Sequence, residues 1–243
     1  MGETFREREL TAPNKTELFC GLGCWVVYLI GMGALALWLL PLLGVDLHSE
    51  TGWSLAQVII LTADFVMAAA VFCRFLWRSF EPLKGNVKRL LMTVLYGFAA
   101  YWTLMCLVSA VVTSVSIGMD VTPDSSNNTA IQTALVNYRV PMAICTVLLA
   151  PVTEECLVRG VLFAPLCRKK PWLAYAVTMV LFSLLHIVQH YEAGQPLLPY
   201  FLTFLEYLPA GLVLGWAYQR TRSVWGPIAL HCLINLLAVV STV

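Results

Sequence analysis

Two acidic residues and one basic residue interrupt an apolar stretch of this chain, where charges are costly. Glu154, Glu155 and Arg159 lie between residues 138 and 166, shortly after Pro151. If this stretch crosses a bilayer, each charge costs roughly 2.5–3.5 kcal/mol at mid-membrane, so three uncompensated charges would cost about 7–10 kcal/mol. Ionisable residues at such a depth are candidates for a functional site.

Spacing supplies a partner for only one of the two carboxylates. Glu155 and Arg159 are four residues apart with the acid first, which is the favourable order for an ion pair along one helix. Glu154 points about 100° away around the same helix, so its partner must come from another segment or from water. Asp64 and Glu206, in two other apolar stretches, are further ionisable residues that could line the same cavity.

Two more apolar stretches carry polar residues at helical spacing. His186 lies four residues before His190, and His231 lies four residues before Asn235. If these stretches pack together as helices, a carboxylate, two imidazoles and an amide could converge. A single membrane histidine often serves only as an interhelical hydrogen-bonding group worth about 0.6 kcal/mol, and we assign that structural role to His190 at its segment end. A Glu154 without a local partner, beside two such pairs, favours a functional site.

The composition excludes a water-soluble globular protein. Of 243 residues, 59% are hydrophobic and 12% are charged, whereas roughly a quarter of an ordinary soluble domain is charged. Stretches of 18 or more residues are almost free of charge, and this length crosses a hydrocarbon core about 30 Å thick. The net charge of +1 gives no support for a nucleic-acid partner. We predict an all-α, polytopic transmembrane helix bundle embedded in a lipid bilayer.

Seven apolar segments are expected to be helices, because backbone polar groups must be satisfied internally in lipid. They cover residues 18–43, 54–77, 90–117, 138–166, 172–189, 197–218 and 224–240. Kinks at Pro141, Pro151 and Pro165 could bring the polar positions to one depth. Residues 118–137 are expected to form a loop, and Gly211 with Gly215 could allow two helices to pack closely.

The basic residues predict the orientation of the bundle. Lys and Arg concentrate in the N-terminal stretch and in the connections after the second, fourth and sixth segments, whereas the loops 44–53, 118–137 and 190–196 contain none. Because short cytoplasmic loops carry the excess of Lys and Arg, we expect a cytoplasmic N-terminus and an outward C-terminus. The pattern divides the chain into a cytoplasmic tail over 1–17 and three transmembrane helices with an outward loop over 18–137.

Three short motifs lie in order on three of the predicted helices: Glu154-Glu155-x-x-x-Arg159, Phe182-x-x-x-His186 and His231-x-x-x-Asn235. In this arrangement they resemble the signature of the CPBP family, which comprises CAAX prenyl proteases of type II and bacteriocin-processing intramembrane proteases, also called Abi proteins. Each motif is weak by itself, whereas all three in order within the membrane form a strong signal. The resemblance covers about residues 138–240 and implies a CAAX protease-like catalytic core over 138–243. Because the family usually has about eight helices, seven or possibly eight are expected.

The resemblance also implies a reaction and roles for these residues. The protein would be an intramembrane endopeptidase with Glu154 as general base and His186 orienting the water or sharing its proton. His231 and Asn235 would donate hydrogen bonds to the developing oxyanion, and Arg159 would hold Glu155 and the local electrostatics. The substrate would be a prenylated CAAX-type protein, a leader peptide or another membrane-associated peptide.

Two cofactor hypotheses fit the same residues. Glu154, His186 and His231 match a known set of catalytic zinc ligands, with water completing the site. The same side chains serve a metal-free glutamate mechanism, which the presence of four polar partners on three helices slightly favours. No other cofactor is implied.

Other functions and protease classes compete with this hypothesis. A non-proteolytic membrane scaffold or bacteriocin self-immunity protein would keep the polar residues for stability or peptide binding. This hypothesis does not explain why every position of catalytic type is filled. A transporter with a proton relay would need a repeated half or matching broken helices, which the sequence lacks. Zinc proteases of the site-two type, rhomboid-like serine proteases and aspartyl intramembrane proteases are excluded by the absence of their motifs. The expected location is the cell membrane if the host is bacterial and the endoplasmic reticulum if it is eukaryotic, and the sequence does not indicate which. It does not indicate the oligomeric state either.

Overall fold

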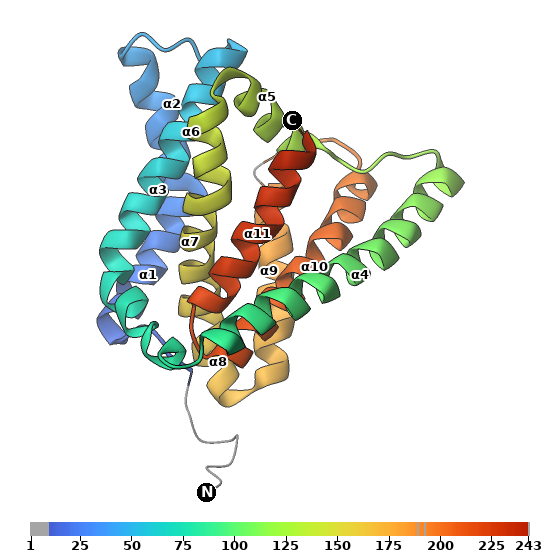
Figure 1. Cartoon of the computed structure of the whole chain (residues 1–243). Coiled ribbons are helices and arrows are strands. Elements are labelled where there is room, and N and C mark those ends of the chain that lie inside the picture. The colour runs from blue at the N-terminus through green and yellow to red at the C-terminus, as the bar shows by residue number, and fades with distance from the viewer. Residues whose placement is uncertain (1–9, 189, 192, 243) are drawn as a thin grey trace, which may run out of the picture.

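The computed structural model describes residues 10–188, 190–191 and 193–242, and within these ranges the chain forms helices and no strand (Figure 1). Six helical rods in the described residues are long and apolar enough to cross a membrane, and a shorter apolar helix follows them over Trp225–Ser241. The seven apolar segments are therefore all helical. The predicted all-α class and the multi-pass membrane protein are confirmed.

The N-terminal part contains three of these rods. The first combines α1 (Lys15–Val26), the π-helical turn η1 (Val27–Gly31) and α2 (Met32–Leu42). Helix α3 (Glu50–Arg78) follows, and a 3-10 turn, η2 (Glu81–Leu83), leads into α4 (Val87–Met119). A capping box starts the first rod, because the Asn14 side chain accepts from the Glu17 amide while Glu17 accepts from the Asn14 amide. Of the predicted tail over 1–17, residues 1–9 lie outside the described residues, and α1 already begins at Lys15.

One helix was not predicted from the sequence. The pattern indicates a loop over residues 118–137, but α5 (Ser126–Asn137) occupies more than half of that range. Polar Ser, Asn and Thr residues at its start conceal the helix, which buries Ala134 and Leu135 against Met142 and Cys145. The prediction was wrong because tertiary packing of a short face, rather than local propensity, stabilises this helix.

The fourth rod alternates between two helix types. Helices α6 (Arg139–Ile144), α7 (Ala150–Glu155) and α8 (Ala164–Lys169) are separated by the π-helical segments η3 (Cys145–Leu149) and η4 (Cys156–Phe163). Pro151 and Pro165 follow these segments, and the carbonyls four residues before them belong to Val147 and Val161, inside η3 and η4. A wider turn is one way to avoid the clash of a proline ring with that carbonyl. At Pro151 and Pro165 the expected distortions thus take the form of π-helical segments, whereas Pro141 lies within the first turn of α6.

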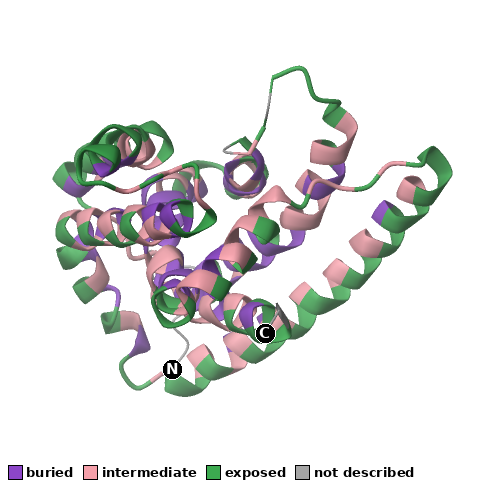
Figure 2. Cartoon of the chain, turned by 90° about the horizontal axis from the view of Figure 1, so that it is seen from above, coloured by how far each residue is buried: buried purple, intermediate pink, exposed green. Residues whose placement is uncertain are grey.

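Helices α9 (Pro171–Val188), α10 (Leu197–Thr221) and α11 (Trp225–Thr242) complete the bundle. A Cβ added at Gly211 of α10 would lie 2.9 Å from the Met179 Cα of α9, and one added at Gly215 would lie 3.0 Å from the Tyr175 ring. The predicted close packing at these glycines is therefore confirmed and is internal to the chain. Helix α4 lies at the edge of the bundle and is mostly exposed along its length (Figure 2).

The basic connections meet at one end of the bundle. The Thr11 amide donates to the Arg222 carbonyl, and the Ser223 hydroxyl donates to the Ser79 carbonyl. These contacts join the start of the described chain, the connection after α3 and the turn between α10 and α11. The end of α11 lies at the opposite end of the bundle (Figure 1). This clustering is what the positive-inside rule leads us to expect, and the cytoplasmic location of the basic end stays a prediction.

Candidate active site

A buried ion pair connects α7 with η4. Glu155 Oε2 lies 2.9 Å from Arg159 Nε, and both side chains are fully buried. The ion pair predicted from the four-residue spacing is confirmed. Because the loss of one partner would leave the other charge buried and uncompensated, breaking such a pair typically costs about 3–5 kcal/mol.

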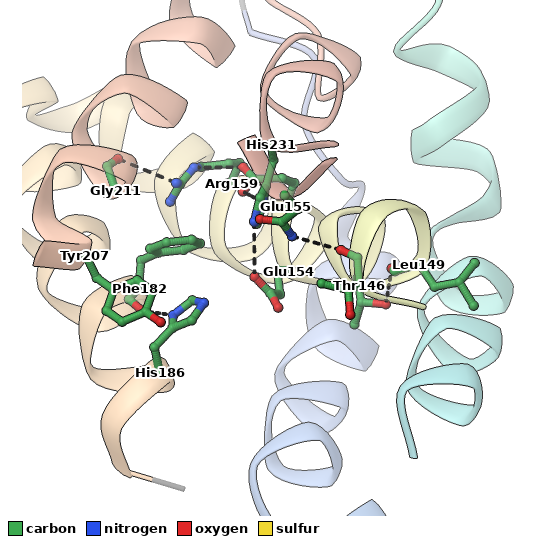
Figure 3. Close-up of polar contacts among 12 residues, drawn as sticks. Thr146, Leu149, Glu154, Glu155, Arg159, Phe182, His186, Tyr207, Gly211 and His231 are labelled. Carbon is green, nitrogen blue, oxygen red and sulfur yellow. Dashed lines mark hydrogen bonds and ion pairs between the residues drawn. The ribbon is translucent and has the colours of Figure 1, made fainter. Parts of the chain in front are cut away.

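Arg159 also contacts two other helices. Its Nη2 lies 3.5 Å from the Gly211 carbonyl of α10, and its guanidinium carbon lies 5.3 Å from the centroid of the Phe182 ring on α9. A planar guanidinium can donate in its plane and stack on an aromatic face at once. Arg159 therefore links the fourth rod to both α9 and α10 (Figure 3).

His231 brings α11 to the two glutamates. Its Nδ1 lies 3.1 Å from Glu155 Oε1, and its Nε2 lies 3.8 Å from Glu154 Oε2. An ionised carboxylate only accepts hydrogen bonds, so Nδ1 carries the hydrogen and donates it to Glu155. The second distance is too long for a hydrogen bond. Glu155 thus orients the imidazole, whose Nε2 faces Glu154 (Figure 3).

The two carboxylate oxygens of Glu154 have different surroundings. Oε1 accepts a hydrogen bond from the Tyr28 hydroxyl across 3.4 Å. Oε2 is buried, faces His231 and has no hydrogen-bond partner among the described residues. The partner that the motifs do not supply thus comes from the first rod. Tyr28 was missed in the sequence because one tyrosine within an apolar span gives no local signal of a polar contact.

His186 approaches the site from α9. Its Nδ1 lies 2.9 Å from the Phe182 carbonyl and donates to it, while its ring stacks on Tyr207 of α10 with centroids 4.2 Å apart. These contacts leave Nε2 on the side of the ring that faces Glu154 in Figure 3. His186 and Glu154 interact electrostatically rather than through a direct hydrogen bond.

Asn235 makes a contact that was not predicted. Its Nδ2 donates to the Thr146 carbonyl in η3 across 2.8 Å, which connects α11 to the fourth rod. The side-chain amide has a second hydrogen that this bond does not use. The structure therefore brings Glu154, Glu155 and His231 into one cluster with Arg159, places His186 beside it, and gives Asn235 a backbone partner in η3.

Comparison with known families bears on this cluster. Residues 136–237 match the family model described as type II CAAX prenyl endopeptidase Rce1-like. The chain carries an Rce1-like domain. The matched segment contains all three motifs, which confirms the resemblance noted in the sequence. No curated protein and no solved structure matches the chain.

The Rce1-like domain does not assemble the predicted zinc ligands into a three-residue set. Among the described residues, no group of three His, Cys, Asp or Glu side chains is close enough to hold a metal ion. His231 Nε2 faces Glu154 Oε2, and the Nδ1 of His186 donates to the Phe182 carbonyl, which leaves its Nε2 without that contact. A zinc ion bound by all three residues would require the side chains to come closer together.

A chain of contacts leads from α5 to His186 in the Rce1-like domain. The Asn127 side-chain amide donates to the Tyr207 hydroxyl across 2.9 Å, and the Tyr207 ring stacks on His186. His190 Nε2 lies 3.3 Å from Asn127 Oδ1, so the structural role predicted for His190 is confirmed. The helix that the sequence did not predict therefore supports one of the predicted site residues.

The two remaining ionisable residues lie at different distances from the cluster. Asp64 of α3 is 2% exposed, and its Oδ1 has no hydrogen-bond partner among the described residues. It interacts electrostatically with Glu154. Glu206 of α10 is half-buried and interacts with Tyr101 of α4. Asp64 thus lies near the site, whereas Glu206 faces the α4 side of the bundle.

Proposed function

We propose that this protein is an intramembrane endopeptidase in which Glu154 activates water for hydrolysis of a peptide bond. The single observation that carries the proposal is the state of Glu154 Oε2. This oxygen is buried and has no hydrogen-bond partner among the described residues, although its neighbour Oε1 has one. A carboxylate oxygen without a donor is available to accept a proton from water.

The reaction balances with the groups present. A water molecule hydrogen-bonded to Glu154 Oε2 transfers one proton to it as the water oxygen attacks the carbonyl carbon. The C–N bond then breaks, and Glu154 returns the proton to the departing amine nitrogen. The products are a carboxylic acid and an amine, the second proton of the water stays on the acid until it dissociates to solvent, and the carboxylate of Glu154 is regenerated.

The tautomers of the histidines limit which groups can stabilise the oxyanion. With Nδ1–H directed to Glu155, a neutral His231 has a lone pair on Nε2 and donates from that atom only when the ring is doubly protonated. The unused hydrogen of Asn235 donates without this requirement. In the proposed mechanism Asn235 therefore stabilises the oxyanion throughout, and His231 joins it when protonated.

Glu155 and Arg159 position these groups and do not touch the substrate in this mechanism. Glu155 orients His231 through one oxygen and pairs with Arg159 through the other. His186 and His231 lie on two sides of Glu154 and can hold the attacking water in place. This division of roles is based on the contacts of the four side chains, and mutagenesis of each residue tests it.

For the substrate, we propose the C-terminal region of a prenylated CAAX-type protein held in the bilayer. The support is the family description, which names a CAAX prenyl endopeptidase, together with the location of Glu154 inside an apolar rod. A prenyl chain partitions into the hydrocarbon phase and so brings the adjoining peptide to the membrane. A leader peptide is the alternative that the experiment below can reveal.

The test compares protein termini in cells that make the wild type or Glu154→Gln at equal levels, using mass spectrometry of terminal peptides. Glu81→Gln is the matched control, because Glu81 is exposed and pairs only with the nearby exposed Lys84 in the described contacts. We expect a set of termini that the wild type and Glu81→Gln produce and Glu154→Gln does not. Identical termini in all three strains would contradict proteolysis and favour the scaffold.

The substrate class is tested with purified protein and a pair of synthetic peptides. The two peptides share one CAAX sequence and differ only in a farnesyl group on the cysteine. We expect release of the C-terminal fragment from the farnesylated peptide at a higher rate. Equal cleavage of both peptides would leave the peptidase in place and contradict the requirement for a prenyl group.

A further inference from the structure

Each of the three π-helical segments in the described part of the chain carries a residue that contacts the site. Thr146 lies in η3, Arg159 lies in η4 and Tyr28 lies in η1. Turns of this type are rare and occur frequently at functional sites. The segments η3 and η4 lie inside the Rce1-like domain and precede prolines, whereas η1 lies in the first rod, where the next proline is Pro41. Proline therefore does not account for η1.

Trp25, near the end of α1 and just before η1, holds the first rod against the fourth rod. Its indole Nε1 donates to the Leu157 carbonyl in η4 across 3.2 Å. The Trp25 and Tyr28 rings also meet edge to face, with centroids 6.4 Å apart. The first rod is thus held to the turn that directly follows Glu154 and Glu155, and Tyr28 projects from it one turn after Trp25.

Tyr28 then selects between the two oxygens of Glu154. A phenol carries its hydrogen at neutral pH, so the hydroxyl donates to Glu154 Oε1 and leaves Oε2 facing His231. A carboxylate can exchange its oxygens by rotation about its last bond. A donor on one oxygen opposes that rotation. Asp64 of α3 interacts electrostatically with both Tyr28 and Glu154, so two N-terminal helices contribute polar groups here.

We propose that Tyr28 is a positioning residue of the active site, which holds Glu154 so that Oε2 is presented to the attacking water. Tyr28 lies outside the segment that matches the family model. The N-terminal rods are then part of the catalytic unit rather than a separate membrane anchor. This proposal rests on the proposed function of Glu154 as general base.

The first experiment measures kcat and KM of purified Tyr28→Phe with the farnesylated CAAX peptide. Tyr96→Phe is the matched control, because Tyr96 is an exposed tyrosine of α4. Loss of a hydrogen bond to a charged group should lower kcat about 10-fold. We expect KM to match that of the control and the melting temperature to fall only slightly, since phenylalanine loses the hydrogen bond to Glu154 but keeps the ring and its contact with Trp25. A purely structural role would instead lower the melting temperature and leave kcat per folded molecule unchanged.

A second measurement does not depend on activity. A double-mutant cycle compares the melting temperatures of Tyr28→Phe, Glu154→Ala and the double variant. We expect the double variant to lose less stability than the two single changes together, because each single change breaks the same hydrogen bond. Additive losses would contradict the contact, whatever the enzyme assay shows.

The outcomes separate the two proposals. If the wild type cleaves the peptide, Glu154→Gln does not, and Tyr28→Phe has the kcat of the wild type, the role of Tyr28 is wrong and the proposed function stands. If Glu154→Gln cleaves at the wild-type rate, the proposed function is wrong and Tyr28 cannot be positioning a base. A raised KM with unchanged kcat in Tyr28→Phe would also overturn the positioning role.

Discussion

Glu155 and His231, 76 residues apart in the chain, form a buried hydrogen bond of 3.1 Å between Oε1 and Nδ1. Because the other oxygen of Glu155 pairs with Arg159, this one carboxylate joins the fourth rod to α11 and fixes the face that His231 presents to Glu154. The adjacent glutamates of one motif therefore have different tasks. Glu155 uses both of its oxygens in contacts with Arg159 and His231, whereas one oxygen of Glu154 has no hydrogen-bond partner among the described residues.

This difference predicts unequal losses of stability for the two glutamates. Glu155→Ala should lower the free energy of unfolding by about 3–5 kcal/mol, because Arg159 would stay buried without its partner. Glu154→Gln should abolish cleavage with a much smaller loss of stability, since Gln keeps an acceptor for the Tyr28 hydroxyl. Thermal unfolding in detergent, with cleavage measured on the same samples, checks both. Equal destabilisation by the two changes would contradict the division of tasks.

Arg159→Lys is expected to behave as a severe substitution. Lysine keeps the positive charge beside Glu155, but an ammonium cannot reproduce the planar contacts with Gly211 and Phe182. We expect the melting temperature and kcat to fall together. Arg220→Lys is the matched control, because Arg220 lies on the exposed side of α10 over Trp216. A variant Arg159→Lys with wild-type stability and activity would show that charge alone suffices.

Asn235→Ala should lower both stability and kcat. The Thr146 carbonyl would lose its donor, and an unmade hydrogen bond of this kind costs about 1–3 kcal/mol. The proposed oxyanion donor would be lost at the same time. Asn235→Asp separates the two effects poorly, so the informative comparison is single-turnover cleavage by Asn235→Ala at a temperature where it is folded. Unchanged single-turnover rates would contradict the oxyanion role.

Metal removal is expected to leave cleavage unchanged. The glutamate mechanism uses side chains alone, and the three candidate ligands are not gathered into one set in the described structure. The measurement is activity before and after dialysis against a chelator, with metal content determined on the active sample. A stoichiometric metal whose removal stops cleavage and whose return restores it would reverse this prediction.

His190 predicts a loss of stability in acid. Burial lowers the pKa of His190 below its ordinary value, against the opposing effect of the Asp124 carboxylate. The unfolded chain then binds the proton first, so stability should fall as the pH drops below about 6.5, until the folded state also takes up the proton. We expect His190→Gln to have a flatter dependence of melting temperature on pH over this window. Parallel curves for the two proteins would contradict it.

Local spacing predicted part of the site and could not predict the rest. The ion pair between Glu155 and Arg159 follows from one helical turn, and the order of the motifs indicated which helices carry polar groups. The contact of Asn235 with Thr146 was not predictable, because its acceptor is a backbone carbonyl that any residue would supply. Tyr28 was missed because its partner lies on a rod far away in the sequence.

The fold shows the same division. Apolar segments of span length identified the rods, and prolines at 151 and 165 indicated where the fourth rod would be distorted. Helix α5 was missed because only a short face, with Ala134 and Leu135, is buried. The π-helical turn at Tyr28 is not followed closely by a proline, so nothing in the sequence indicates it. Both features depend on residues that are distant in the sequence and become neighbours only in the folded chain.

Gly211 links the spacing between α9 and α10 to a hydrogen bond of the candidate site. Its missing side chain sets how closely α10 approaches Met179, and its carbonyl receives a hydrogen bond from Arg159. Any residue with a Cβ at this position would widen the gap between two helices and withdraw an acceptor from the guanidinium in the same movement. We therefore expect substrate turnover to depend on the distance between these two helices at Gly211.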